Sequence, residues 1–350
     1  MEWILYGATG VTGRLITEVA LRRGHRPILA GRNADALRPL AERHGLSWRV
    51  LDLGDKNALR QLTGLAPLML LAASTFDTSS RRVAYACLDA GAHYLDLANE
   101  IPVLEALYGL DELARARNVT LLPGVGFGTI AADTLARHVV EQLPNASVLD
   151  LTIDLYTAGS SSGARANALR ALASGGLIRR GGQLTSVKFG SRTAGAVIPP
   201  GVRAVVAVPS GELAAAYRTT GIANISVSRP VPLPPAMARA LLPGLAVLAR
   251  SRTLQNWVGN RPPSDRSHID LDRRSRVWAR AEGRAGQIAI AQLETGEGYA
   301  FSAESAVAAV EVVLADPVPG AHSPGALLGP DFALRIPGTR RIDARKGTEV

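Results

Sequence analysis

Short apolar runs alternate with amphipathic stretches over the first 125 residues of the chain. Six of these runs have the length and apolar character of buried strands, and the segments between them have helical periodicity. The six runs are residues 3–6, 27–30, 48–53, 67–72, 93–97 and 119–122. Strands that alternate with helices predict a doubly wound parallel sheet, which is a Rossmann-type fold of the α/β class.

The pattern changes near residue 148, where apolar and polar positions begin to alternate with a period of two. This alternation is typical of half-exposed antiparallel strands, and it predicts a second α+β domain with a mainly antiparallel sheet. The alternating runs are residues 148–157, 202–208, 222–227, 276–281 and 287–294. We therefore expect a dinucleotide-binding domain, a substrate and dimerisation domain, a helix that packs back on the first domain, and a Pro/Gly-rich tail. Their expected bounds are 1–144, 145–301, about 302–316 and 317–350.

Three glycines follow the first apolar run at the spacing Gly-x-x-Gly-x-x-Gly and lead directly into a helical pattern. Such a turn brings the backbone close to a pyrophosphate and points the first N–H groups of the helix at the anion. The position between a strand and a helix makes the motif specific, although a glycine-rich turn without a ligand is the alternative. The residues expected to bind the pyrophosphate are Gly7, Thr9, Gly10, Val11, Thr12 and Gly13.

The end of the second apolar run indicates which dinucleotide binds. NAD-specific domains place an acidic residue there for the ribose 2′-hydroxyl, but this chain has Arg32. A guanidinium pairs with a 2′-phosphate, so the sequence predicts NADP(H) unless Arg32 is a solvated loop residue. Asn33 stands beside it and is the expected N-cap of the next helix. Asp52, after the third run, is placed to meet the adenine amine.

Ligands of open α/β sheets bind beyond the carboxyl ends of the strands, so the residues after the later runs should line the nicotinamide pocket. Those residues are Ala73, Ser74, Phe76, Asn99, Gly124, Gly126 and Phe127.

Composition adds several exclusions. The net charge is +9, but the arginines are dispersed rather than gathered into a stripe, so we expect no nucleic-acid partner. Cys87 is the single cysteine, and the six histidines show no metal-ligand spacing, so we expect no metal. No secretory segment precedes the first strand, which predicts a cytoplasmic protein. The apolar segment 232–250 is too short and interrupted for stable membrane insertion, and it is either a covering helix, a lid over an apolar substrate or a membrane-surface contact.

Four motifs together resemble the saccharopine dehydrogenase-like oxidoreductases, a family that includes trans-acting enoyl reductases. They are Gly-Ala-Thr-Gly-Val-Thr-Gly-Arg at 7–14, Leu-Ala-Gly-Arg-Asn at 29–33, Cys-Leu-Asp-Ala-Gly-Ala-His-Tyr-Leu-Asp-Leu at 87–97 and Leu-Pro-Gly-Val-Gly-Phe at 122–127. The resemblance covers about the first 130 residues, with a looser likeness at 320–329. It implies NADP(H) in a Rossmann domain, a second domain that shapes the substrate site and often the homodimer, and chemistry at a C–N or C=C bond.

The chain departs from the family pattern where nicotinamide and substrate should meet. Ala-Ser-Thr-Phe at 73–76 replaces Ala-Gly-Pro-Phe, Ala-Asn-Glu at 98–100 replaces Thr-Gly-Glu, and Gly128 stands where an acidic residue is common. No tyrosine has a lysine four residues later, which excludes the short-chain dehydrogenase mechanism. Tyr156 and Arg165 are the leading candidate proton donors, and Tyr94 is a third candidate that is alternatively a core residue.

The sequence thus predicts an NADPH-dependent reductase that acts on a C=C (enoyl) or C=N (imine) bond of a small or carrier-bound metabolite. The alternatives are a saccharopine-type amino-acid C–N dehydrogenase and a non-catalytic NADP-sensing regulator. The alternating strands of the second domain also predict a sheet-mediated homodimer.

Overall fold

Two β-sheets form the framework of the computed structural model, which describes residues 1–73, 76–157, 175–187, 194–198, 201–231 and 273–343, with isolated positions between 237 and 251. The chain divides into two units. Unit 1 comprises Met1–Ile130 and Tyr299–Pro337, and unit 2 comprises Ala131–Gly298 and Gly338–Val350. Unit 1 therefore takes residues from two distant parts of the chain.

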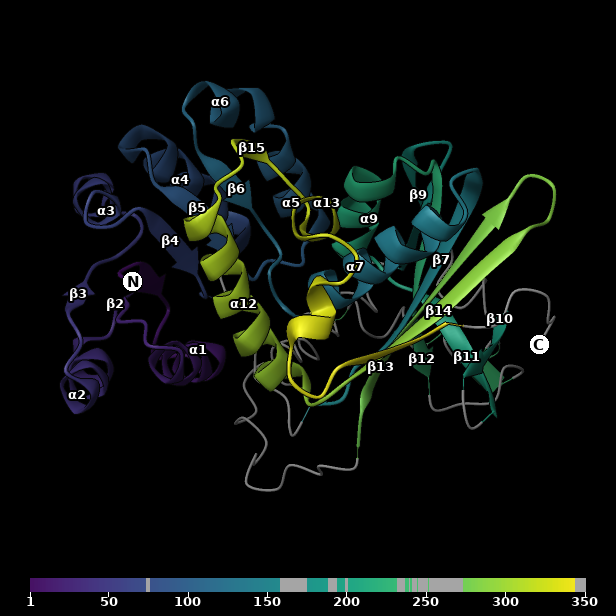
Figure 1. The fold of residues 1–350 in the computed structure, drawn as a ribbon, viewed down its shortest axis with the longest axis horizontal. Helices are drawn as coiled ribbons and strands as arrows, with labels where there is room; N and C mark the ends of the chain where they lie inside the picture. The colour runs from purple at the N-terminus through teal and green to yellow at the C-terminus, as the bar shows by residue number, and fades with distance from the viewer. Residues whose placement is uncertain are drawn as a thin grey trace. The chain divides into compact units, whose positions relative to one another are not determined.

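Unit 1 contains a parallel sheet of seven strands in the order β15-β6-β5-β4-β1-β2-β3 (Figure 1). The strands are β1 (Ile4–Tyr6), β2 (Ile28–Gly31), β3 (Trp48–Val50), β4 (Leu68–Leu71), β5 (His93–Asp96), β6 (Thr120–Leu122) and β15 (Gly320–Ala321). The six predicted strands are all present, and β15 adds a seventh from the segment expected to be a tail. The strand order reverses between β1 and β4, which is where such sheets bind ligands.

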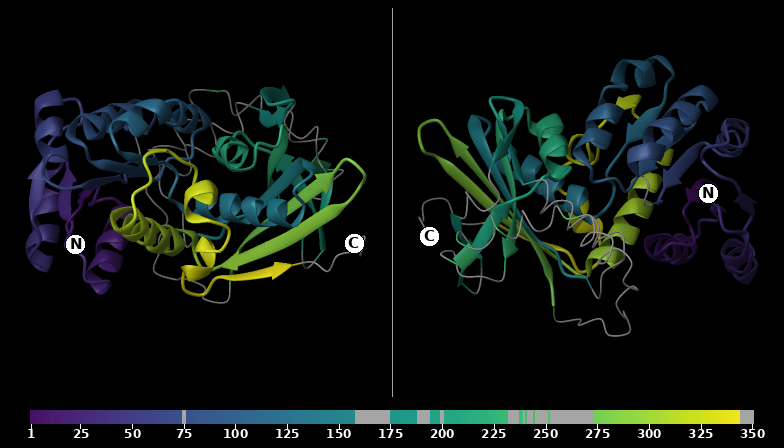
Figure 2. Two further views of the ribbon diagram at one scale, coloured as in Figure 1. Left: turned by 45° about the horizontal axis from the view of Figure 1, so that its top comes forward. Right: turned by 180° about the vertical axis from the view of Figure 1, so that it is seen from behind.

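Helices cover both faces of this sheet. The helices of unit 1 are α1 (Val11–Arg22), α2 (Ala34–His44), α3 (Lys56–Thr63), α4 (Phe76–Ala90), α5 (Ile101–Tyr108), α6 (Asp111–Ala116), α12 (Gly298–Ala315) and α13 (Pro324–Leu328), with a 3₁₀ turn at Phe332–Arg335. Helices α3, α4 and α5 pack side by side, and the left view of Figure 2 shows the sheet between this layer and the layer that contains α1 and α12. The strands β1 and β4 between the two layers are fully buried, which explains their continuous apolar character.

The helix ends follow from local chemistry. Gly24 follows Arg23, the C-cap of α1, and Gly45 is the C-cap of α2; their positive φ angles of 78° and 60° are a conformation that glycine adopts without strain. Asn33 caps α2, because its Oδ1 accepts a hydrogen bond from the Ala36 N–H at 3.2 Å. Gly24 and Gly45 thus end helices on the side of the sheet where β2 and β3 begin, whereas Asn33 starts α2 at the carboxyl edge, directly after β2.

Helix α12 is the one helix in the described part of the chain that is long and apolar enough to cross a membrane. More than half of it is buried inside the protein, as in a core helix. Its side chains at Phe301, Ala306, Val310 and Val313 are almost completely buried.

Unit 2 is built on a mixed sheet with the order β10-β11-β12-β7-β13-β14-β16, to which β8 and β9 are added beside β12. Its strands are β7 (Ala146–Asp154), β8 (Gly176–Arg180), β9 (Gln183–Val187), β10 (Ala194–Ile198), β11 (Gly201–Ala207), β12 (Asn224–Val231), β13 (Ser275–Gly283), β14 (Ile288–Thr295) and β16 (Arg340–Asp343). The β7–β12 pair is parallel and the other pairs are antiparallel. The long β13–β14 hairpin is visible in both views of Figure 2. Two further helices are α7 (Phe127–Gln142), which continues from unit 1 into unit 2, and α9 (Glu212–Thr220).

Several predicted features lie outside the described residues. Ser74, Arg165 and most of the apolar segment 232–250 belong to this part of the chain.

Candidate functional site

The glycine turn between β1 and α1 has the geometry of a phosphate-binding turn. Gly7 has a φ of 93°, and a Cβ atom there would lie 2.8 Å from the backbone carbonyl of Ala72. A Cβ at Gly13 would lie 2.2 Å from the Gly7 carbonyl oxygen. These two glycines are therefore required by the packing of the protein itself.

Gly10 differs, because a Cβ atom there would meet only the Gly7 carbonyl oxygen at 3.4 Å. Its backbone is extended, with a φ of −70°, which any residue adopts. Nothing in the described structure requires a glycine here, so the exposed space beside Gly10 fits the close approach of a ligand.

The N-terminus of α1 fits an anion at the same place. No side chain caps it, and its first turn contains no acidic residue. The N–H groups of Val11 and Thr12 precede the first hydrogen bond of the helix, from the Arg14 N–H to the Gly10 carbonyl at 3.0 Å. Unpaired N–H groups and the positive end of the helix dipole together favour a phosphate. The residues present therefore fit the pyrophosphate of a dinucleotide.

Arg32 and Asp52 lie near one another beyond the ends of β2 and β3. Burial raises the pKa of the Tyr6 hydroxyl, the charge of Arg32 lowers it and the charge of Asp52 raises it, so both side chains act on the same buried hydroxyl. Tyr6 donates its hydrogen bond to the Leu51 carbonyl at 3.1 Å. Arg32 is exposed, as a side chain that binds a phosphate in solution must be.

The side chains of Asp52 and Asn33 are partly used by the protein itself. One carboxylate oxygen of Asp52 accepts the Gly54 N–H at 2.7 Å, which leaves its other oxygen for a ligand. The Asn33 oxygen accepts the Ala36 N–H and caps α2, as the sequence predicts, so this oxygen is used by the protein itself. Sequence reasoning missed Arg82, whose Nη1 donates to the Leu53 carbonyl at 3.1 Å and braces the loop after β3.

Asp96, which sequence reasoning also missed, joins the two loops that follow β5 and β6. Its Oδ1 accepts the N–H groups of Ala98 and Gly124, both at 2.9 Å, and its Oδ2 accepts the Tyr94 hydroxyl at 2.6 Å. The side chain is completely buried, and burial raises the pKa of the carboxyl to about 6 against the opposing effect of these hydrogen bonds. One carboxyl group thus fixes the spacing of both loops.

Tyr94 is completely buried, and its hydroxyl donates a hydrogen bond to Asp96. Burial is also the main cause that raises the pKa of its hydroxyl well above the ordinary value. A proton donor must contact the substrate, and this geometry corrects the candidate catalytic role of Tyr94 in favour of the core role considered beside it.

The segment 123–127, which we call the nicotinamide-side loop, is held on several sides. The Val125 N–H donates to the Asp96 carbonyl at 2.8 Å, and the Ser305 hydroxyl donates to the Val125 carbonyl at 3.0 Å. The Ser302 hydroxyl oxygen accepts the Phe127 N–H at 3.0 Å. Backbone groups that are paired in this way keep the loop in one conformation.

The residues predicted to line the nicotinamide pocket lie at this edge of the sheet, but some of their side chains are used by the protein itself. Asn99 accepts a hydrogen bond from the Thr129 hydroxyl at 3.2 Å, which connects the loop after β5 to the first turn of α7. The Phe127 ring is buried and packs edge-on against Phe301 with 5.3 Å between ring centroids, so only its backbone can line the pocket. Ala73 and Phe76 are half-buried beyond the end of β4.

Tyr156 belongs to unit 2, where its backbone N–H donates to the Ser275 hydroxyl at 3.0 Å. The guanidinium of Arg273 lies over its ring at 5.0 Å. This contact holds the aromatic ring in place.

The described residues contain no group of three or more His, Cys, Asp or Glu side chains that could hold a metal ion. Cys87 is completely buried, and burial raises the pKa of its thiol, so it has the character of a packing residue and not of a nucleophile.

Comparisons with known proteins agree with this site. A family model described as the saccharopine dehydrogenase NADP binding domain matches residues 3–122. The structure is similar to an apo saccharopine dehydrogenase (L-Glu forming) from Saccharomyces cerevisiae, with a TM-score of 0.65, 13% identity and coverage of 98% of this chain and 100% of that chain. It is equally similar to a homospermidine synthase from Legionella pneumophila in complex with NAD, with a TM-score of 0.65, 11% identity and coverage of 98% and 91%. No curated protein sequence matches the chain.

Proposed function

Residues 3–122 form a saccharopine dehydrogenase NADP-binding domain, and from this premise we propose that the protein is an NADPH-dependent reductase of a C=C (enoyl) or C=N (imine) bond in a small or carrier-bound metabolite. The family is one of NADP-binding oxidoreductases, and the bound cofactor supplies the hydride. The observation that supports cofactor chemistry most directly is the space at Gly10 in front of the uncapped N-terminus of α1.

Different residues of unit 1 bind different parts of the cofactor. The turn from Gly7 to Gly13 binds the pyrophosphate, and Arg32 binds the 2′-phosphate through charge-assisted hydrogen bonds. Asp96 and the nicotinamide-side loop orient the nicotinamide end of the site and exclude water from the buried side of that loop. Positioning of the two reactants is the largest contribution that these residues make to the reaction.

Reduction also requires a proton for the atom that gains electron density when hydride reaches the substrate carbon. We assign this proton to Tyr156 or Arg165, which the sequence places in the second domain. The Arg273 guanidinium supports Tyr156, because its contact with the ring holds that side chain in place. Loss of a single such donor typically lowers turnover about 10²- to 10³-fold.

The experiment is single-turnover oxidation of NADPH by the purified protein with an enoyl thioester and, separately, a cyclic imine. Oxidation with either substrate identifies the reactive bond. Tyr156→Phe should then lower the rate about 10²-fold while the affinity for NADPH stays the same. A Tyr156→Phe protein with the wild-type rate would move the proton donor to Arg165 or to water.

Cofactor choice is tested separately. Arg32→Ala should weaken NADPH binding about 10- to 100-fold and leave NADH binding nearly unchanged, because only NADPH carries the 2′-phosphate. Arg49→Ala, an exposed arginine on the neighbouring β3, is the matched control. Tighter binding of NADH than of NADPH by the wild-type protein would refute the assignment of Arg32.

The alternative function is a non-catalytic NADP sensor. A sensor would bind NADPH with the same dependence on Gly10 and Arg32 but would oxidise it with neither substrate class. A saccharopine-type dehydrogenase would instead reduce NADP⁺ in the presence of a secondary amine formed from two amino-acid skeletons. The same NADPH absorbance assay therefore separates the three functions.

A further inference from the structure

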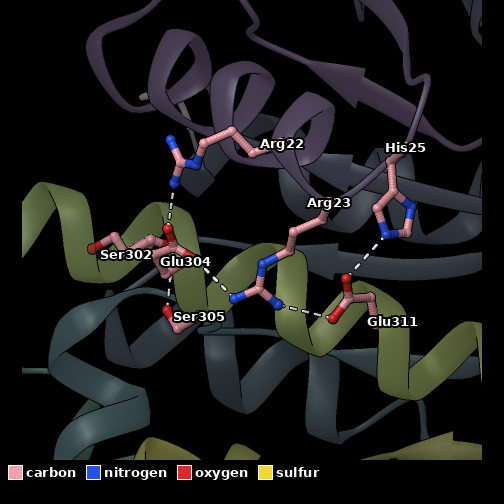
Figure 3. Close-up of polar contacts among 7 residues, drawn as sticks. All are labelled: Arg22, Arg23, His25, Ser302, Glu304, Ser305 and Glu311. Carbon is pink, nitrogen blue, oxygen red and sulfur yellow. Dashed lines mark hydrogen bonds and ion pairs between the residues drawn. The ribbon is translucent and has the colours of Figure 1, made fainter. Parts of the chain in front are cut away.

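Helix α12 has only two charged residues, Glu304 and Glu311, and both bind the C-terminal end of α1. They are seven positions apart, which is two helical turns, so they lie on the same face. Arg22 and Arg23 bind Glu304 at 2.5 and 2.7 Å, and Arg23 also binds Glu311 at 2.9 Å (Figure 3). Arg23 thus bridges both glutamates and joins the two helices at two points.

His25 adds a buried contact to this cluster. The Trp3 indole N–H donates to His25 Nδ1 at 3.4 Å, and an indole nitrogen can only donate. His25 Nδ1 therefore carries the lone pair, and its Nε2–H donates to Glu311 at 3.0 Å. His25 is 4% exposed and Glu304 is 16% exposed, so part of the cluster is shielded from water and from screening by salt.

The same two turns of α12 also hold the nicotinamide-side loop. Ser302 and Ser305 lie one turn apart, and their hydroxyl groups bind the Phe127 N–H and the Val125 carbonyl. The segment from Ser302 to Glu311 therefore contacts both the helix that begins at the pyrophosphate turn and the loop expected at the nicotinamide. All of these contacts lie within unit 1.

We propose that α12 sets the spacing between the pyrophosphate turn and the nicotinamide-side loop, and that Glu304 and Glu311 are positioning residues for the nicotinamide half of the cofactor. The glutamates do not touch the cofactor and act through Ser302 and Ser305. Surface ion pairs alone stabilise little, so the proposal concerns the position that this cluster gives to α12 and not its net energy. The proposal depends on NADP(H) binding and not on which bond the protein reduces.

The test compares two ligands that share the adenosine half of the cofactor. NADPH contains the nicotinamide, whereas adenosine 2′,5′-bisphosphate contains only the adenosine and its phosphates. In the variant Glu304→Gln/Glu311→Gln, which keeps the side-chain volume, calorimetry should show about fivefold weaker binding of NADPH and unchanged binding of adenosine 2′,5′-bisphosphate. The fluorescence of bound NADPH should also move toward that of free NADPH, because the nicotinamide is less well held.

Glu42→Gln is the matched control, because it removes the same charge from the exposed Arg38–Glu42 pair on α2. It should change the affinity for neither ligand. Equal loss of affinity for both ligands in the double variant would indicate general loosening of the unit and would overturn the proposal, as would no loss for either ligand.

A second variant, Ser302→Ala/Ser305→Ala, tests the connection without altering the charges. It should show the same selective loss for NADPH, which keeps the proposal testable if the glutamate variant does not fold. In the quadruple variant, the loss of binding free energy for NADPH should be smaller than the sum of the losses in the two double variants, because both pairs of substitutions act on one loop. Additive effects would contradict a route from the glutamates through the serines.

Discussion

At the scale of single residues, Gly10 and Gly13 lack side chains for different reasons. The Gly13 position is closed by the Gly7 carbonyl, whereas the Gly10 position opens toward the exposed side of the turn. Within one motif, Gly13 is therefore required for folding, whereas Gly10 is required for ligand binding.

We therefore expect Gly10→Ala to fold with nearly the wild-type melting temperature and to bind NADPH at least tenfold more weakly, because the added methyl group occupies the approach of the pyrophosphate. Gly13→Ala should instead lower the melting temperature, because its Cβ collides with backbone. Thermal unfolding and calorimetric titration of both variants check this pair of outcomes. A Gly10→Ala protein with normal affinity would show that no phosphate approaches this turn.

Burial and hydrogen bonding have opposite effects on the pKa of Asp96: burial raises it and the hydrogen bonds lower it. Its pKa of about 6 in the folded protein lies above the ordinary value of 3.8, so the folded state binds the proton more tightly than the unfolded state. The stability that this proton contributes is present below the unfolded pKa and is lost as the pH rises through about 6. The difference amounts to roughly 3 kcal/mol at most.

Asp96→Asn should remove this pH dependence. An asparagine keeps an oxygen for the Ala98 and Gly124 N–H groups and offers an N–H to the Tyr94 oxygen, so its contacts survive without a titrating group. Urea unfolding between pH 4 and 8 should show that the variant gains stability relative to wild type as the pH rises. Asp89→Asn, an exposed aspartate on α4, is the control. Parallel pH profiles for wild type and Asp96→Asn would exclude the raised pKa.

At the scale of elements, the hydrophobic pattern of the sequence was sufficient to predict the strands that are central in their sheets. The runs that became β1, β2, β4 and β5 are buried on both faces, and β7 and β13 show the period of two expected from one buried face. The elements that the sequence did not reveal are short or at an edge, such as β15 with two residues and β16 with four. Their pairing is decided by partners far away in the chain and not by their own composition.

The same reason limits prediction of the site. The glycine turn, Arg32 and the loop glycines are local signals and were predicted. The roles of Ser302, Ser305 and Asp96 depend on contacts across long stretches of sequence, since Ser302 binds a backbone group 175 positions away. Nothing in the local pattern around these residues distinguishes them from other helix serines or strand-end acids.

The strand β16 has charged side-chain contacts at both of its ends, through Arg340 and Asp343, and Arg340 makes the contact with the neighbouring strand. Arg340 binds Glu294 of β14 directly across the sheet, and Arg276 binds the same carboxylate. Burial alone would raise the pKa of Glu294, but the hydrogen bonds and charges of Arg276 and Arg340 outweigh it and lower the pKa below the ordinary value. A lowered pKa stabilises the fold above the unfolded pKa of Glu, and this contribution is lost as the pH falls through the folded pKa.

Arg340→Ala should therefore loosen β16 and leave the rest of unit 2 intact. Hydrogen exchange of residues 340–343 should become faster by about fivefold, which corresponds to about 1 kcal/mol for a largely exposed partner. The wild-type strand should show the same loosening as the pH falls through the lowered pKa of Glu294, where the carboxylate becomes protonated. Unchanged exchange in Arg340→Ala would assign the docking of β16 to its backbone hydrogen bonds and to the contact of Asp343 with His138.

At the scale of the whole molecule, we propose a homodimer through the sheet of unit 2. Its half-exposed face contains complementary cross-strand pairs, with Asp150 opposite Arg280 and Thr152 opposite Trp278. Trp278 is bound in place, because its indole N–H donates to Gln292 at 3.0 Å. A fixed, half-exposed aromatic side chain within a polar face is a common centre of a protein interface.

Light scattering at micromolar concentration should give twice the chain mass of 36.8 kDa. Trp278→Glu should shift the mass toward the monomer, whereas Tyr85→Glu, at an exposed aromatic residue on α4 of unit 1, should not. A wild-type protein that remains monomeric up to tens of micromolar would remove the proposal.

The division of unit 1 between Met1–Ile130 and Tyr299–Pro337 determines the order in which a ribosome can complete it. When β6 emerges, its outer edge has no β15, and the nicotinamide-side loop has no Ser302 or Ser305 to hold it. About half of the chain, including most of unit 2, is synthesised after β6 and before these partners. Unit 1 therefore begins before unit 2 but lacks these contacts until most of unit 2 has been made, so a growing chain can hold the nicotinamide-side loop in place only after that point.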